Sequence, residues 1–565
     1  MGYLLHILLA VAAQAAGESG ASLAELPSVF GLVLLPVPWL LAQTLRRAAM
    51  AGHFKRAARQ ARALHVLAPA LFACLTLGTD WVQRVRDWTG AELNLFSWPE
   101  ASLAVAFAPF VLLQVVVLHA EAVAHEPGVA ARRARVVFQS RMFFSSLVPL
   151  GLYVMLSASV GWVPGWKENV QEVALIHAGF MTALLTVLAL SLPTILTHTW
   201  DTVPLAPGPQ REILNTVGRR AGFQPRALLV WRTGHQMANA AVVGFGGRGR
   251  RVLFSDALLS MLSLRELAAV YAHEIGHVKC RHVAVFLAWA LTFFLAGDLA
   301  ATWIAPGDAW LETGIVVGSL VVWALCFGWY SRRCELEADL FSLELLGDPE
   351  AMMSALERVG GRSRDVAGWR HFSTAARVGF LVEAWRNPDL VQRFRRRLRR
   401  LAWLGGVLFV LLVGAQAWGL AQRFDQDRVR AELAVGHWER AVERAERIEE
   451  FDTEILEVLR AGAERQGERE RLTPADLERE LTTELRRADW AGGAADAELL
   501  AVLGWPGLDT VGELCAHLAA GRRVQGQTLL KDCPQRWAIH IREGLGAGEQ
   551  QADPERPGSG PRSLQ

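Results

Sequence analysis

The feature that most constrains this chain is a series of long, uncharged apolar stretches, each able to cross a lipid bilayer as a helix. About 20 consecutive apolar residues match the thickness of the hydrocarbon core. With 52% hydrophobic and only 20% charged residues, the 565-residue chain is not a string of soluble domains. Eight spans are predicted, at residues 28–45, 64–79, 101–120, 142–163, 173–196, 283–305, 313–330 and 401–420.

A ninth apolar segment precedes them at residues 3–16. It is either the core of a signal peptide or a first span. No basic leader precedes it, so a retained span is the preferred interpretation.

Loop charges predict the orientation, because basic residues in short loops are retained on the cytoplasmic side. Loops 46–63 and 121–141 carry six and four basic residues, whereas the outward loops carry two at most. This alternation places residues 197–282 and 331–400 on the cytoplasmic side and everything after residue 420 outside. Arginine far outnumbers lysine and alanine is abundant, so we expect a multi-pass protein of a bacterial inner membrane.

The charge balance and the cysteines exclude several classes of protein. The 58 basic and 56 acidic residues nearly cancel, giving a net charge of +2, so no nucleic-acid partner is expected. Six cysteines without a C-x-x-C pair exclude a disulfide scaffold and a thiolate zinc module. Only Cys515 and Cys533 lie beyond the last span, in a compartment expected to be oxidising, and we predict a disulfide between them.

The segment after the last span reads as helical from 421 to about 545, with charged faces and alanine-rich stripes. Residues 436–441, Gly-His-Trp-Glu-Arg-Ala, resemble part of a degenerate tetratricopeptide helix. One such unit is weak support, and a generic amphipathic helical domain is the preferred interpretation. Residues 546–565 are rich in Gly, Pro, Gln and Ser and are predicted to be disordered.

Residues 273–277, His-Glu-Ile-Gly-His, form an H-E-x-x-H motif. On a helix, residues four apart share a face, so His273 and His277 can bring two imidazoles to one Zn²⁺. The adjacent Glu274 is the candidate general base. Ser263 and Glu266 form a possible capping box at the start of this helix. The alternative is that the two histidines lie on a solvated helix and bind no metal. A third ligand is needed to distinguish a zinc site from this alternative.

An acidic cluster just after the seventh predicted span supplies that ligand. Two spans separate it from the histidines, so the chain returns to the same face of the membrane. Glu335 and Asp339 are four apart and share a helical face, so Glu335 can bind the metal while Asp339 orients a ligand imidazole. Glu337 is expected to point elsewhere. A charged juxtamembrane helix is the alternative.

Together these residues resemble the membrane zinc metallopeptidases that include HtpX and the type 1 CAAX prenyl endopeptidases. Residues 239–259 look like the family's edge hairpin, and residues 331–339 are similar to its second signature. His371 and Arg377 resemble a third element, which implies that they approach the scissile carbonyl. The resemblance implies a zincin-like fold, one Zn²⁺ per chain and a polypeptide substrate.

The hairpin itself suggests how a substrate peptide would bind. Apolar runs at 238–243 and 250–254 are joined by glycines, a pattern typical of a β-turn. The G-x-G-x-x-G string at 244–249 is not read as a dinucleotide site, because no helix follows it. An exposed edge strand can pair with a peptide by β-augmentation, so Asn239, Ala240 and Val242 are the candidate substrate-binding residues.

The predicted fold is mainly α: a polytopic helical membrane protein with a zincin-like catalytic domain and a helical C-terminal extension. The predicted function is a membrane-embedded zinc metalloendopeptidase that hydrolyses membrane or membrane-associated proteins. The alternative is a membrane sensor or signalling metalloprotein regulated by its C-terminal domain. The oligomeric state is left open. The predicted layout is an apolar segment at 1–27, spans at 28–200, catalytic segments at 201–282 and 331–400 separated by two spans at 283–330, a span at 401–420, an outside tail at 421–545 and disorder at 546–565.

Overall fold

The computed structural model divides into two compact units, and each is described by itself. The first comprises Met1–Ser159 and Ala183–Gln416, and the second Val160–Thr182 and Ala417–Gln565. The structure describes residues 2–552 except 19–30, 32, 35, 54–59, 61–62, 65, 94–98, 127, 161–162, 164–165, 167–169, 171, 245–248, 305–308, 362–364, 450, 468, 504, 506, 523–528 and 531–532.

The N-terminal part of the first unit is a set of helices packed around aromatic side chains. Phe110 lies at its centre and contacts Phe72 and Phe143 at ring-centroid distances of 5.7 and 6.1 Å. All three rings are buried, which is what holds these apolar helices together in one bundle. The helices are α1 (Gly2–Glu18), α2 (Val37–Met50), α4 (Leu67–Gly78), α5 (Trp81–Leu93), α6 (Pro99–His125) and α7 (Val129–Val160).

Five of the described helices are long and apolar enough to cross a membrane, which confirms a polytopic helical fold. These candidate spans, Ser102–Val123, Ala174–Thr199, His282–Ala301, Gly314–Leu346 and Pro388–Gln422, coincide with five of the eight predicted ones. The predicted span at 64–79 is the shorter α4, and those at 28–45 and 142–163 include residues outside the described ranges. The count of eight therefore stays a prediction.

A four-stranded sheet follows the helix α8 (Ala174–Thr199) in the order β1-β2-β4-β3. Strand β4 is central and buried, and it pairs in parallel with β2 and antiparallel with β3. The predicted hairpin is present, with β3 at the edge of the sheet, and part of its glycine turn lies outside the described residues. The strands are β1 (Thr202–Pro204), β2 (Ala227–Trp231), β3 (Ala240–Val243) and β4 (Arg251–Ser255).

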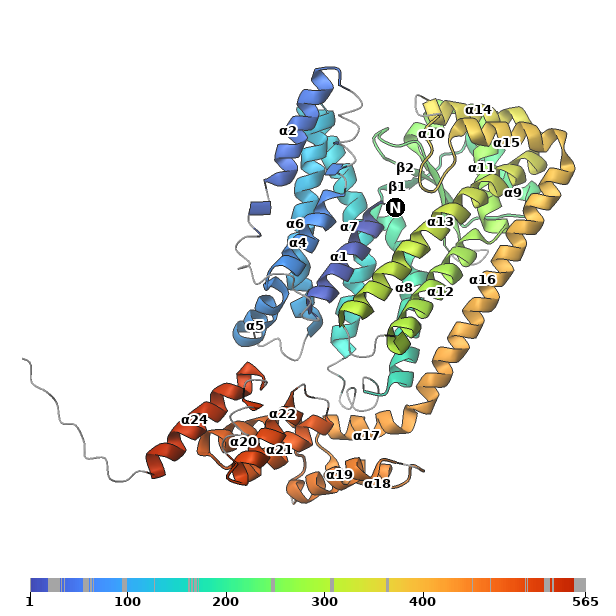
Figure 1. Ribbon diagram of the computed structural model, residues 1–565. Coiled ribbons are helices and arrows are strands. Elements are labelled where there is room, and N and C mark those ends of the chain that lie inside the picture. Colours follow the sequence, from blue (N-terminus) through green and yellow to red (C-terminus); the bar gives the residue numbers. More distant parts are fainter. Residues whose placement is uncertain are drawn as a thin grey trace, which may run out of the picture. The chain divides into compact units, whose positions relative to one another are not determined.

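Helices α10 (Asp256–Met261) and α11 (Leu264–Lys279) contact this sheet (Figure 1). Helix α13 continues well beyond residue 330, where the predicted span ends, because residues 331–346 contain no glycine or proline. It ends before Gly347, which has a φ of +67°. The helices are α9 (Pro209–Arg220), α10 (Asp256–Met261), α11 (Leu264–Lys279), α12 (His282–Ile304), α13 (Ala309–Leu346), α14 (Pro349–Gly360), α15 (Thr374–Arg386) and α16 (Pro388–Gln422).

The second unit contains the tail, which is helical as predicted. Trp438 is fully buried at the centre of its core. The indole Nε1–H donates to the Leu472 carbonyl at 2.8 Å, and a Cβ on Gly462 would lie 2.1 Å from the ring. The tail helices are α17 (Phe424–Ala434), α18 (Trp438–Ala445), α19 (Thr453–Gln466), α20 (Pro474–Arg487), α21 (Trp490–Val502), α22 (Leu508–Ala519) and α24 (Gln535–Ala552).

The structure bears on two further predictions about the tail, the start of disorder at residue 546 and the disulfide between Cys515 and Cys533. Helix α24 extends to Ala552, past the predicted start of disorder, and residues 553–565 lie outside the described ranges. Cys515 and Cys533 are free thiols, so the structure does not contain the predicted disulfide. Both lie in the same apolar core, where burial raises the pKa of Cys515 to about 12 and that of Cys533 to about 11. The disulfide between Cys515 and Cys533 therefore stays a prediction.

Truncation of Trp438 should unfold the tail selectively. We expect Trp438→Ala to lower the free energy of unfolding of this unit by about 3–5 kcal/mol, because it removes a large buried ring and its hydrogen bond. Pulse proteolysis of the full chain in detergent, read by fragments of the tail, measures this. Ile539→Ala, at a position that is 48% exposed, is the matched control and should change little. Equal sensitivity of the two variants would contradict the assignment of Trp438 to the core.

Candidate active site

The H-E-x-x-H motif lies on α11, whose start and buried face are those the sequence predicts. The Ser263 side chain accepts from the Glu266 N–H and the Glu266 carboxylate accepts from the Ser263 N–H, so the capping box is formed. Leu267, Tyr271 and Ile275 are buried in the core beside the sheet. Because these three side chains pack into the core, His273 and His277 lie on the side of α11 that packs against α13.

Gly276, inside the motif, determines how closely α11 and α13 approach. A Cβ at this position would lie 3.0 Å from Ala338 Cα and 3.1 Å from Phe341 Cβ. Contacts this short would force the two helices apart. The glycine thus allows the acidic cluster of α13 to reach the imidazoles.

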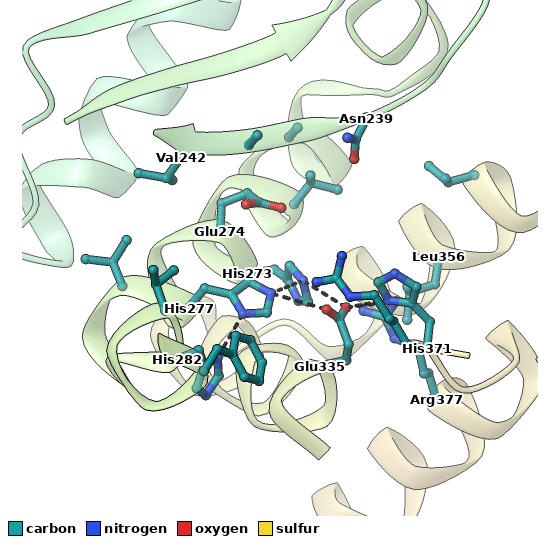
Figure 2. A pocket seen from close by; sticks show the side chains of 18 of the residues that line it. Asn239, Val242, His273, Glu274, His277, His282, Glu335, Leu356, His371 and Arg377 are labelled. Atoms are coloured by element: carbon teal, nitrogen blue, oxygen red, sulfur yellow. Dashed lines mark hydrogen bonds and ion pairs between the residues drawn. The ribbon is translucent and has the colours of Figure 1, made fainter. Parts of the chain in front are cut away.

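Three donor groups converge at this crossing (Figure 2). The Nε2 atoms of His273 and His277 are 3.1 Å apart, and each lies 3.6 Å from an oxygen of Glu335. In a tetrahedral zinc site with bonds of about 2.0–2.1 Å, donor atoms are about 3.3 Å apart. The donor types and their spacing therefore fit Zn²⁺, and they bring together the three ligands that the sequence predicts.

The outer nitrogen of His273 is held by a buried carboxylate. Its Nδ1 lies 2.8 Å from Oδ1 of Asp339, as the sequence predicts. Arg377 donates to the same carboxylate through Nε and Nη2, at 2.8 and 2.6 Å. The guanidinium fork is therefore engaged with Asp339, a contact that the sequence does not predict, while its Nη1 lies 3.6 Å from Oε2 of Glu335.

The outer nitrogen of His277 is held by residues that sequence reasoning missed. Its Nδ1 lies 2.8 Å from Nδ1 of His282, whose Nε2 lies 3.0 Å from Oε2 of Glu337. Glu337 is not in the group formed by His273, His277 and Glu335, as expected from helical spacing, but it contacts His282, and both side chains are buried there. The turn between α11 and α12, in which Arg281 has a φ of +57°, brings His282 back towards the motif.

These contacts select one tautomer of His277. A carboxylate only accepts hydrogen bonds, so Glu337 fixes an N–H on Nε2 of His282, and in an imidazole with one proton Nδ1 is then the acceptor. His277 must then carry its proton on Nδ1, which leaves its Nε2 lone pair free for a metal. His282 and Glu337 thus contact the outer nitrogen of His277 in series, and a histidine five residues after the motif was the available signal in the sequence. Cys280, His282 and Glu337 form a second group of potential metal donors, but the direct contact between His282 and Glu337 accounts for their proximity.

The titratable groups of α11 are strongly shifted by their surroundings. Burial raises the pKa of Glu274 to about 7 and lowers that of His277 to about 3. Burial alone would lower the pKa of His273 as well, but the Asp339 carboxylate outweighs it and the pKa is raised. His277 is therefore neutral, the form in which an imidazole binds a metal.

One cavity of about 1000 Å³ joins the remaining candidate residues to this cluster. Glu274, His371 and Arg377 line it, as do the predicted substrate-binding residues Asn239, Ala240 and Val242. In Figure 2, Glu274 lies between strand β3 and the histidines. His371 is half-exposed, and its Nδ1 is 3.3 Å from Oε2 of Glu335. The structure thus brings every catalytic and substrate-binding candidate to one space.

The profile of Peptidase family M48 matches residues 210–398, which include the sheet's hairpin, α11 and the acidic part of α13. Over these residues the chain is similar to peptidase family M48. A Protease HtpX homolog of Bordetella petrii is 27% identical over 251 residues, covering 39% of this chain and 84% of that protein. A Protease HtpX homolog of Aeropyrum pernix is 27% identical over 236 residues, covering 39% and 73%.

Among solved structures, S. mikatae Ste24p aligns with 61% of this chain and 98% of its own, at 15% identity and a TM-score of 0.33, too low to inform the fold. The family match and the HtpX homologs establish a metalloprotease. With the candidate spans, they support a multi-pass membrane metalloprotease.

Removal of His282 should weaken metal binding without changing a ligand. We expect His282→Ala to lower Zn²⁺ affinity about 10- to 100-fold, because the proton of His277 Nδ1 loses its acceptor. Competition with a chelator of known affinity, on protein purified in detergent, measures this. Glu337→Gln, which keeps an acceptor oxygen, should lose less than Glu337→Ala, and His198→Ala is the control histidine. Native affinity in His282→Ala would contradict the positioning role.

Proposed function

We propose that this protein is a zinc endopeptidase that cleaves membrane or membrane-associated proteins from the cytoplasmic side of a bacterial inner membrane. The observation that carries the proposal is the shape of the catalytic cavity. It runs from His273, His277 and Glu335 to an apolar wall between two candidate spans, lined by Phe286, Leu287 and Ala290 of α12 and by Trp323 and Phe327 of α13. A wall of this kind suits apolar side chains of a membrane-derived substrate.

Strand β3 would hold the substrate backbone in an extended form. The Asn239 carbonyl accepts from the Ser255 N–H, and bonded positions alternate along an antiparallel pair. Ala240 and Val242 therefore direct their backbone N–H and C=O groups away from β4, towards the open edge. A peptide paired at that edge would be held largely through its backbone.

His273, His277 and Glu335 would hold the zinc ion, which when bound would polarise the scissile carbonyl as a Lewis acid. Glu274 would accept the proton of the attacking water on its carboxylate and deliver it to the leaving nitrogen. His371 stands beside Glu335 at the cavity and is the proposed donor to the developing oxyanion. Arg377 would act chiefly by fixing Asp339, and through it His273.

The decisive variant is Glu274→Gln. We expect it to keep zinc but to lose peptide hydrolysis by several orders of magnitude, because a neutral amide cannot accept the proton of the water. Casein hydrolysis by protein purified in detergent, with metal content from mass spectrometry, tests this. The matched control is Glu350→Gln, at an exposed carboxylate on α14. Substantial hydrolysis by Glu274→Gln at native zinc content would overturn the assigned base.

The proposed membrane orientation predicts which residues a membrane-impermeant reagent can label. Because Cys515 and Cys533 are buried, new exposed cysteines are needed, and Glu464 in the tail and Arg220 in α9 are exposed. In intact spheroplasts, a membrane-impermeant maleimide should label Glu464→Cys, whereas Arg220→Cys should label only after lysis. The native protein gives the background of its own cysteines. The reverse pattern would invert the proposed topology, and labelling of both only after lysis would place the tail inside.

A further inference from the structure

We propose that a cavity between α13, α15 and α16, outside the catalytic site, binds the headgroup of an anionic phospholipid. This cavity has a volume of about 600 Å³. Its cationic side is made by Arg395, Arg396 and Arg399 of α16, and its apolar floor by Leu340 and Leu343 of α13. The inference is independent of the proposed peptidase chemistry.

The charge inside the cavity is unbalanced. Arg395 donates to both oxygens of Glu344, at 2.8 Å each, so that pair is neutral. Among the described residues, neither Arg396 nor Arg399 has a hydrogen-bond or ion-pair partner. Two exposed guanidinium groups therefore face the cavity without a counter-charge, and guanidinium forks suit phosphate oxygens.

The position along α16 favours a lipid over a soluble anion. The apolar stretch predicted to span the membrane starts at residue 401. At 1.5 Å per residue, the Cα atoms of Arg396 and Arg399 lie about 3–8 Å from it along the helix. This is the depth of the headgroup layer, which is about 5–8 Å thick on each side of the hydrocarbon core. Trp385 also lines the cavity and is 56% exposed, as is typical of aromatic residues at a membrane interface.

The helix provides its own control, because its arginines point in different directions. Arg393 and Arg397 are four apart on α16 and do not line the cavity. A diffuse attraction of the whole basic segment to an anionic surface would depend on either pair of arginines. Binding inside the cavity would depend on Arg396 and Arg399 and not on Arg393 and Arg397.

The test is a lipid titration of delipidated full-length protein in detergent, followed by native mass spectrometry. The probes are phosphatidylglycerol, phosphatidylcholine of the same chain length and inorganic phosphate. We expect phosphatidylglycerol to bind at least tenfold more tightly than phosphatidylcholine. The double variant R396Q/R399Q should bind it about 30-fold more weakly, and R393Q/R397Q should stay within about threefold of the native protein.

Three results would overturn the proposal. An equal loss of phosphatidylglycerol affinity in both double variants would mean that the whole basic segment attracts the lipid and that the cavity does not bind it. Equal binding of the two lipids would remove the selectivity for an anionic headgroup. Displacement of phosphatidylglycerol by millimolar inorganic phosphate would assign the cavity to a soluble anion. Native zinc content in both double variants shows that the fold is intact.

Discussion

The close crossing of α11 and α13 at Gly276 is the contact on which the active site depends. The motif helix supplies two imidazoles and the other helix supplies carboxylates, and neither set forms a metal site alone. Because Gly276 has no side chain, Ala338 and Phe341 can pack directly against the backbone of α11. The same crossing buries Asp339 completely beside His273. One small residue thus determines the ligand spacing and the environment of the outer contacts.

Around this crossing, each ligand histidine is oriented by an acidic residue of α13. His273 contacts Asp339 directly, whereas His277 reaches Glu337 through His282. Buried carboxylates are costly unless they are paired, and here the imidazoles and Arg377 provide the partners. The arrangement leaves Nε2 of both ligand histidines free for the metal. Glu335, Glu337 and Asp339 are therefore linked through the two histidines, although only Glu335 lies among the proposed metal donors.

Local patterns in the sequence predicted much of this site. The capping box at Ser263, the apolar stripe of α11, the edge hairpin and the convergence of Glu335 with the histidines all follow from short-range spacing or from counting membrane crossings. The roles of Glu337 and Arg377 did not follow, because they depend on which charged side chains tertiary packing buries together. Helical spacing alone placed Glu337 away from Glu335, which is correct, but it could not show that the turn at Arg281 brings His282 to meet it. Helices α13 and α16 extend beyond the predicted spans at 313–330 and 401–420, because hydropathy marks where apolar residues stop and not where a helix ends.

The continuity of α13 has a mechanical consequence. Its 38 residues correspond to a rod about 57 Å long, nearly twice the thickness of the hydrocarbon core. The apolar half and the half that carries Glu335 and Asp339 share one unbroken backbone, with no hinge between them. A long span adapts to a thinner bilayer by tilting. Because α13 is continuous, such a tilt would be transmitted along the helix to the segment that carries Glu335.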